Sequence, residues 1–368
     1  MKGRVLLLEV MLRTTPGSWP LPPTRAALVV DGRLDDLLID AQGSNWTPGP
    51  GDICPAKITR IIPGGAFANA LNGIDAEFYL RDTKALSQGQ TVIVQVTGYA
   101  EAGKATPATT RLLHKGRHII HTPGAPGVNI SRQIRDPEEK TRLTDALTGL
   151  EPSGLIVRSA AIGADSEMLR QEAEMLIEHG EECARGTFQP YPICLNNRAE
   201  RIAQKEWTTP PPDVVHLVGA EAYTLEDGLA AAPFDGDPFD HFGVLDEIDR
   251  LRQPRVDLPS GGWMAIEATR AMVTVDVNTG DQFGGGAAMT ANIEASRELP
   301  RQLRLRGLGG QVIIDFAPLK KMHRKKIEET LKTAFRRDPI DTTLAGWTPL
   351  GNFELQRKRE RRPLSELL

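Results

Sequence analysis

Two acidic residues and one amide carry the chemistry that this sequence could perform. The run VTVDVNTGD, residues 273 to 281, is typical of a β-strand, in which residues two apart point to the same face. Asp276 and Asn278 would then share one face, while Val275 and Val277 pack on the other. A solvated strand face followed by an Asn-Thr-Gly turn is the simpler interpretation of this run.

The second carboxylate, Asp315, ends the apolar run QVIID. This run predicts a strand that is otherwise fully buried, and a buried charge without a partner is costly. Asp315 should therefore meet a cation, a metal ion or several hydrogen-bond donors. One interpretation is a structural salt bridge to an arginine, and the other is a metal site that Asp315 shares with Asp276 and Asn278.

The donor atoms of this second interpretation are all oxygens. Such a set favours Mg²⁺ or Mn²⁺ over zinc, and Mg²⁺ often completes its shell with water and substrate phosphate. A metal held in this way can activate water or stabilise charge on a phosphodiester. The spacing alone indicates this chemistry weakly, because Asp-x-Asn and a strand-end Asp are both frequent.

The elements that must position these side chains alternate between strands and helices. Residues 262–280 predict two adjacent strands, and 311–319 predict another. Residues 292–310 predict a helix stopped by glycines, and 320–338 predict a further helix. This alternation indicates an α/β domain.

The first half of the chain has a different character. Short β patterns with glycine-containing turns between residues 56 and 121 predict a small barrel. Residues 136–150 and 165–182 have the spacing of amphipathic helices, and 153–163 read as a buried strand that leads into a loop. Proline- and glycine-rich breaks separate these regions, at residues 14–24, 45–52, 121–127 and 208–213.

Composition limits the class of protein. The chain has 368 residues and a net charge of −4, but residues 301–368 contain sixteen Lys and Arg against eight Asp and Glu. This basic block is either a solvated surface or a phosphate-contacting one. No run is long and apolar enough to span a membrane. The three cysteines, Cys54, Cys183 and Cys194, show no Cys-x-x-Cys spacing, so we expect neither a disulfide framework nor a zinc site. This cysteine usage fits a reducing compartment, and we expect a cytoplasmic location.

Several long motifs resemble one known family. The runs LPSGGWMAIEATRAMVTVDVNTG and NIEASRELPRQLRLRGLGGQVIIDF resemble the catalytic region of the ribonuclease E/G family, which cleaves single-stranded RNA. The resemblance extends upstream through AKITRIIPGGAF and GLIVRSAAIG, from about residue 27 to residue 362. It implies that Asp276 and Asp315 bind Mg²⁺, with Asn278 as the third catalytic residue, and that the metal activates water.

The resemblance also implies an α+β multidomain fold. An S1 (OB-fold) barrel would occupy residues 28–111, inserted in an RNase H-like subdomain formed by 1–27 and 200–252. A 5′-sensor subdomain would follow at 112–199, and a DNase I-like catalytic subdomain at 253–368.

The family's RNA-contacting positions can be carried over to this chain. Phe67, Phe78 and Lys104 match positions that contact RNA, where aromatics stack on bases and a lysine meets phosphate. Core packing is the alternative for each phenylalanine. Five residues match a pocket that reads a 5′ monophosphate: Arg158, Ser159, Gly116, Ile120 and Arg132. Serine stands at 159 where the family has threonine, and it keeps the hydroxyl donor.

Three departures from the family pattern are visible. The sequence ends at RKRERRPLSELL without the Cys-Pro-x-Cys segment through which family members share zinc, so a zinc-linked dimer is not expected. The loop after Asn278 is shorter and lacks an acidic stretch. After Asp315, FAPLKKM replaces a segment that usually carries another aspartate.

These observations favour a Mg²⁺-dependent endoribonuclease that acts on single-stranded, A/U-rich RNA, such as precursors of ribosomal, transfer or messenger RNA. It would leave 5′-phosphate and 3′-hydroxyl ends, with stimulation by a 5′ monophosphate. Basic residues near the site could contact the RNA backbone: Arg304, Arg306, Lys320, Lys321 and Arg324. The alternative is an inactive RNA-binding protein or assembly factor that retains the fold, and a DNA nuclease is a third possibility.

Overall fold

The chain forms two compact units. The first consists of Met1–Leu7, Ala27–Ile39 and Pro233–Leu368, and the second of Leu8–Ala26 and Asp40–Ala232. The computed structural model describes residues 2–10, 23–41, 47–71, 73–82, 84–100, 103–150, 153–185, 196–219, 225, 229–281 and 286–368. Among these residues, no helix combines the length and apolar character that crossing a membrane requires.

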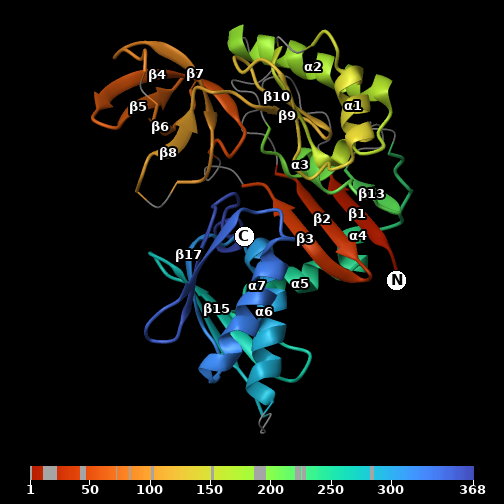
Figure 1. The fold of residues 1–368 in the computed structure, drawn as a ribbon, viewed down its shortest axis with the longest axis vertical. Coiled ribbons are helices and arrows are strands. Elements are labelled where there is room, and N and C mark those ends of the chain that lie inside the picture. Colours follow the sequence, from red (N-terminus) through yellow and green to blue (C-terminus); the bar gives the residue numbers. More distant parts are fainter. Residues whose placement is uncertain are drawn as a thin grey trace. The chain divides into compact units, whose positions relative to one another are not determined.

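A six-stranded mixed sheet, which includes the labelled strands β15 and β17, dominates the first unit (Figure 1). Its strand order is β14-β15-β16-β17-β19-β18. The predicted pair of adjacent strands is confirmed as the antiparallel strands β15 and β16. The strands are β14 Arg255–Asp257, β15 Trp263–Ala268, β16 Val273–Asn278, β17 Gly310–Asp315, β18 Thr342–Trp347 and β19 Phe353–Arg357.

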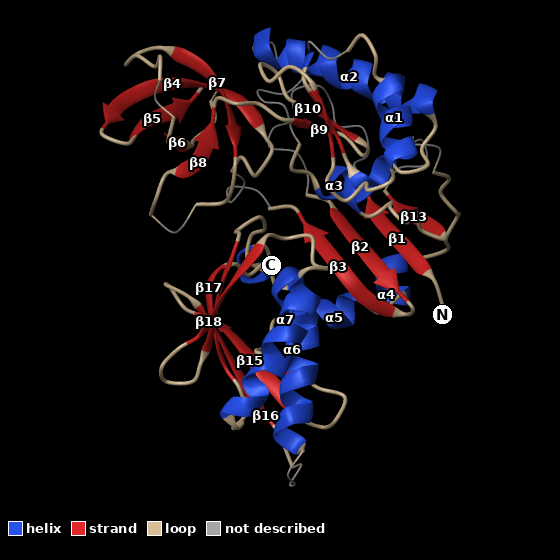
Figure 2. Ribbon diagram, in the orientation of Figure 1, coloured by secondary structure: helices blue, strands red, loops and turns tan. Residues whose placement is uncertain are grey.

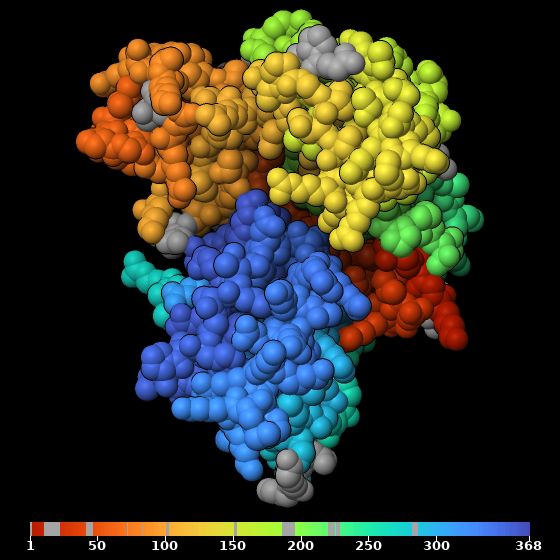
Figure 3. Space-filling model, in the orientation of Figure 1, coloured from red at the N-terminus to blue at the C-terminus, as the bar shows by residue number. Residues whose placement is uncertain are grey.

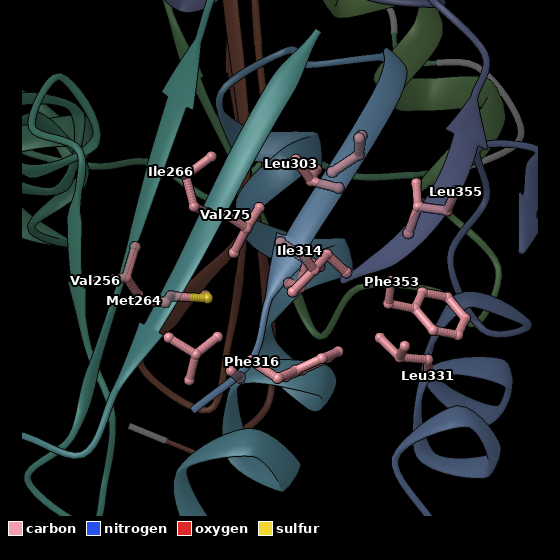
Figure 4. Packing of buried hydrophobic residues seen from close by; sticks show 14 of the residues in the cluster. Val256, Met264, Ile266, Val275, Leu303, Ile314, Phe316, Leu331, Phe353 and Leu355 are labelled. Atoms are coloured by element: carbon pink, nitrogen blue, oxygen red, sulfur yellow. The ribbon is translucent and has the colours of Figure 1, made fainter. Parts of the chain in front are cut away.

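Two helices, α6 Ala287–Leu305 and α7 Arg324–Phe335, cover one face of this sheet (Figure 2). Figure 4 shows Val275 and Ile314 of the sheet in the same core as Leu303 of α6 and Leu331 of α7. The shorter helices of this unit are α4 Pro238–His241, α5 Val244–Leu251, η5 Lys321–His323 and η6 Leu364–Glu366. The sheet thus has one buried face and one open face.

A closed five-stranded barrel of S1/OB-like type lies in the second unit, with strand order β4-β5-β6-β8-β7. Its residues form the orange lobe of the space-filling view (Figure 3). The strands are β4 Ile53–Ile62, β5 Gly65–Ala70, β6 Glu77–Leu80, β7 Thr91–Val96 and β8 Thr106–Thr109. The predicted barrel is confirmed, but it begins at residue 53 rather than 28.

The second unit also contains a four-stranded sheet of order β11-β12-β10-β9, packed against two helices. These helices are α1 Pro137–Ala146, which Asp136 caps by accepting from the N–H of Glu138, and α2 Ser166–Arg185. The other elements are β9 His114–Lys115, β10 Ile119–His121, β11 Val128–Ile130, β12 Leu155–Val157, η3 Ser159–Ala161 and α3 Ala199–Glu206.

A third sheet has the strand order β13-β1-β2-β3, and the division between the units runs through β1 and β2. This sheet contains β2 and β3, whose residues from 28 onward were expected to belong to the barrel. The strands are β1 Arg4–Glu9, β2 Arg25–Val30, β3 Arg33–Ile39 and β13 Val214–Val218.

Candidate active site

The open face of the six-stranded sheet brings the two aspartates together. Strands β16 and β17 are parallel neighbours, and Asp276 and Asp315 are partners in their register. Register partners of adjacent strands point to the same face and lie roughly 4.8 Å apart along the hydrogen-bonding direction. The predicted juxtaposition of two carboxylates from separate strands is therefore present.

Asn278 joins this pair. Its Nδ2–H donates to Oδ2 of Asp276 at 2.7 Å. Val275 and Val277 are buried, whereas Asp276 is exposed, so the predicted alternation of β16 is confirmed. The amide is thus held by one carboxylate, and among the described residues its Oδ1 atom has no hydrogen-bond partner.

The expectation that Asp315 lies in a fully buried strand is wrong. Strand β17 alternates between buried and accessible residues, and Asp315 is exposed. The apolar Ile313 on the same face suggested full burial, but the helices cover only the opposite face of the sheet. Within the described part of the chain, Asp315 has no salt bridge or side-chain hydrogen bond, so the structural ion-pair interpretation has no support there.

Two adjacent carboxylates repel each other, because like charges on paired strand positions are destabilising. A bound cation would remove this repulsion. The set offers two carboxylates and one amide oxygen, with access to solvent for water ligands, and this donor set fits Mg²⁺ or Mn²⁺.

A buried asparagine fixes the chain beyond Asp315. The amide of Asn292, on α6, donates through Nδ2 to the carbonyl of Ala317 at 2.9 Å and accepts from the N–H of Ala317 at 2.9 Å. Asn292 is completely buried. The FAPLKKM segment is therefore tied to the helix immediately after the carboxylate, a role that gave no signal in the sequence.

Two glycines allow the turn after Asn278 to pack closely. Gly280 has φ +60°, and a Cβ there would lie 2.5 Å from the carbonyl oxygen of Gly261. A Cβ on Gly262 would lie 2.7 Å from the carbonyl oxygen of Asn278. Residues 282–285 of the predicted loop lie outside the described residues.

The basic residues proposed to contact RNA divide into two groups. Lys320 and Lys321 are exposed, and the guanidinium of Arg324 lies 4.8 Å from the ring centroid of Trp347. Arg304 and Arg306 are buried, with 7% and 6% of their surface exposed. Arg304 pairs with Asp36 and Asp338, and Arg306 donates to the carbonyl of Gln253. For these two arginines, the predicted backbone contact is wrong.

In the barrel, Phe67 is partly exposed, but Phe78 is completely buried in the core. Phe78 cannot stack on a base, so this part of the prediction is wrong. Its neighbour Tyr79 instead pairs with Phe67 across strands β5 and β6, with ring centroids 5.4 Å apart. The guanidinium of Arg60 lies 4.4 Å from the Phe67 centroid. Lys104 is exposed in the β7–β8 loop.

The residues matched to the 5′-phosphate pocket surround the end of the β11-β12-β10-β9 sheet. Arg158 follows β12 and Arg132 follows β11, its parallel neighbour. Ile120 pairs with Ile156 of β12, and Ser159 begins η3. At Gly116 a Cβ would lie 2.1 Å from Oε1 of Glu172. The glycine therefore allows Glu172 to reach and accept from the N–H of His118 at 2.9 Å.

Arg158 is already engaged by protein groups. Its Nη1 donates to the carbonyls of Gly116 at 2.8 Å and Arg117 at 3.1 Å, and its Nη2 pairs with Glu206 at 2.8 Å. Glu206 also pairs with Lys115 at 2.7 Å. Burial alone would raise the pKa of Glu206, but Lys115 and Arg158 hold this pKa below its usual value. Glu206, which the sequence analysis missed, thus remains an anion beside Arg158.

These features define an α+β protein that combines an S1/OB-like barrel with an exposed carboxylate pair suited to a divalent cation. The sequence profile described as the Ribonuclease E/G family matches residues 114–206 and 216–360. The chain therefore belongs to the ribonuclease E/G family, and the resemblance noted in its motifs is confirmed.

Individual relatives agree with this assignment. The chain is 29% identical to a protein named Ribonuclease G from Haemophilus influenzae and to one from Escherichia coli, in each case over 98% of this chain and 81% of the relative. It is also 29% identical to Ribonuclease E of Escherichia coli, over 91% of this chain and 36% of that longer protein. A solved multidomain protein with nucleic acid binding domains from Streptococcus pneumoniae matches with a TM-score of 0.17 and 12% identity, over 45% of this chain and 57% of that one, which is too weak to bear on the fold.

Proposed function

We propose that this protein is a divalent-metal-dependent endoribonuclease that cleaves single-stranded, A/U-rich RNA in RNA processing. The observation that carries the proposal is the register of β16 and β17, which pairs Asp276 with Asp315 on an exposed face beside Asn278. Membership in the ribonuclease E/G family and similarity to proteins named ribonuclease G and E support it. In this proposal the chain combines RNase H-like, 5′-sensor and DNase I-like subdomains with the barrel.

The site residues have distinct roles in this proposal. Asp276 and Asp315 hold Mg²⁺, and Asn278, oriented by its bond to Asp276, offers its carbonyl oxygen to a water molecule. The ion, when bound, activates water and stabilises negative charge on the phosphate. Attack by water with release of the 3′ oxygen leaves 5′-phosphate and 3′-hydroxyl ends. Lys320 and Lys321 supply positive charge for the RNA backbone.

Cleavage of a short, single-stranded, A/U-rich RNA tests the activity. We expect cleavage with Mg²⁺ or Mn²⁺ and none with EDTA, with products that carry 5′ phosphates. RNA binding without cleavage under both ions would contradict the proposal and favour a binding protein or assembly factor that has kept the fold.

The barrel surface formed by Phe67, Tyr79 and Arg60 is proposed to bind RNA, together with Lys104. Two partly exposed rings beside a cation can stack on bases and meet phosphate, and stacking contributes about 1 to 3 kcal/mol per base. Replacing Phe67 by alanine should therefore weaken RNA binding by roughly 5- to 150-fold, as measured by fluorescence anisotropy with EDTA present.

The matched control is Phe78→Leu. Phe78 lies on β6, the strand next to that of Phe67, and its side chain faces the barrel core. Because its side chain is buried, this substitution should leave RNA affinity unchanged while slightly lowering barrel stability. Equal RNA affinity of Phe67→Ala and the wild type would show that this barrel surface does not stack on bases.

The pocket formed by Arg158, Ser159, Gly116, Ile120 and Arg132 is proposed to sense a 5′ monophosphate. In the described structure, Nε–H and one Nη2–H of Arg158 are not used by the contacts to Gly116, Arg117 and Glu206. A guanidinium with two free donors can still bind phosphate. Glu206 competes for this cation, so we expect only modest stimulation in the wild type.

Neutralising this competitor provides the test. Glu206→Gln should raise the ratio of cleavage rates on 5′-monophosphate and 5′-hydroxyl RNA several-fold, because the variant removes the negative charge between Lys115 and Arg158. Arg158→Lys should lower this ratio. Glu174→Gln, which breaks an exposed helical pair with Arg170, is the matched control. An unchanged ratio in both Glu206→Gln and Arg158→Lys would exclude sensing at this pocket.

A further inference from the structure

Three potential metal ligands meet inside the second unit. His114 lies on β9, and His179 and Cys183 lie on α2. One ligand atom from each of the three lies within 4.8 Å of the others. His179 and Cys183 are four residues apart on one helix face, and Nε2 of His179 lies 3.7 Å from Sγ of Cys183.

The ring of His114 is buried, with 1% of its surface exposed, and neither of its nitrogens has a hydrogen-bond partner among the described residues. Buried polar groups in proteins are almost always bonded, and one left unsatisfied costs about 1 to 3 kcal/mol. A neutral imidazole is a common metal ligand, so a bound cation would satisfy one of these nitrogens.

The surroundings hold this cluster in place. Gly180, between the two helical ligands, lets α2 approach β9 and β10, because a Cβ there would lie 2.6 Å from the ring of His121 and 3.2 Å from that of His114. His121 stacks on His114 with centroids 5.5 Å apart, and its Nδ1–H donates to the carbonyl of Leu176 at 3.0 Å. The orientation of the His114 ring is thus restricted from both sides.

We propose that His114, His179 and Cys183 bind one transition-metal cation of the Zn²⁺ type, with the fourth position left to water or another ligand. Zinc prefers nitrogen and sulfur donors, and bonds of about 2.1 and 2.3 Å place tetrahedral ligands about 3.4 to 3.8 Å apart. The His179–Cys183 separation already lies in this range, and the other ligand-atom separations, all within 4.8 Å, exceed it by at most about 1.4 Å. Binding releases the thiol proton and links α2 to the sheet.

This inference is independent of the proposed nuclease activity. It also departs from the expectation of no structural zinc, which rested on the missing Cys-x-x-Cys spacing. Sulfur and imidazole donors favour Zn²⁺, whereas the carboxylate pair favours Mg²⁺, so the two sites should bind different ions.

The test uses the full chain, stripped with a chelator and titrated with Zn²⁺ or Co²⁺. We expect one tightly bound ion and, for Co²⁺, an absorption band of a thiolate–metal bond with the intensity of tetrahedral coordination. Cys183→Ala should abolish the thiolate band and weaken Zn²⁺ binding at least about 100-fold. This loss exceeds the usual effect of removing a group that only hydrogen-bonds to a metal ligand. Cys54→Ala is the matched control, because Cys54 is the other buried cysteine among the described residues.

Further variants test whether Zn²⁺ binds at this cluster and not at another histidine or at the carboxylates. His114→Asn should weaken Zn²⁺ binding to a similar extent, whereas His323→Asn, which removes a histidine of the other unit, should not. Asp315→Asn should leave Zn²⁺ affinity unchanged, which separates this site from the carboxylates. A wild-type Co²⁺ complex without a thiolate band, or equal Zn²⁺ affinity of Cys183→Ala and Cys54→Ala, would overturn the proposal.

Discussion

Replacing Asp315 by asparagine is expected to lower the single-turnover rate of RNA cleavage by about 10³-fold or more. The amide keeps the shape of the side chain but removes one of the two charges that would hold the metal. RNA affinity should stay unchanged, because the barrel residues are untouched. Stability in the absence of Mg²⁺ should not fall, since the substitution also removes the like charge beside Asp276.

The matched control is Glu267→Gln. Glu267 is an exposed carboxylate on β15 and pairs with Thr274, two register positions away from the Ala265–Asp276 pair. Its neutralisation should change the cleavage rate little. A normal rate for Asp315→Asn, or equal losses in Asp315→Asn and Glu267→Gln, would contradict the role given to the pair.

Replacing Asp338 by asparagine is expected to destabilise the first unit by about 3 to 5 kcal/mol, the usual cost of breaking a buried ion network. Asp338 accepts from Arg304 and, at 2.8 Å, from Arg357, which is fully buried. Arg304 also pairs with Asp36 at 3.2 Å. The variant would leave Arg357, a fully buried residue of β19, without its carboxylate partner.

Native-state hydrogen exchange of the β19 amides measures this effect within one unit. Asp341→Asn is the matched control, because Asp341 is exposed and lies three residues away. Its effect should stay within about 0.5 kcal/mol. A similar effect of both variants on β19 exchange would show that the buried network contributes little.

Local sequence patterns were sufficient to predict much of the first unit. The two-residue period of β16 placed Asp276 and Asn278 on one face, and glycines and residue spacing located α6, α7 and the strand β17 between them. The long motifs then indicated the family, which the profile match confirmed.

Burial could not be predicted so well. Phe78 and Tyr79 are adjacent aromatics, and only the closed barrel decides which of them faces the core. Arg304 and Arg306 look like solvent-exposed charges in a basic block, yet residues far away in the chain, such as Asp36 and Gln253, enclose them. In each case the partner that decides the environment is distant in sequence.

The sequence by itself determined the oxygen donors, the elements that carry them and the family, because these depend on residue type and on short periodicities. The tertiary structure alone decided the register that pairs Asp276 with Asp315, the ion pair of Glu206 with Arg158, and the meeting of His114 with His179 and Cys183. Each of these depends on long-range packing, which brings together residues that have no recognisable spacing along the chain.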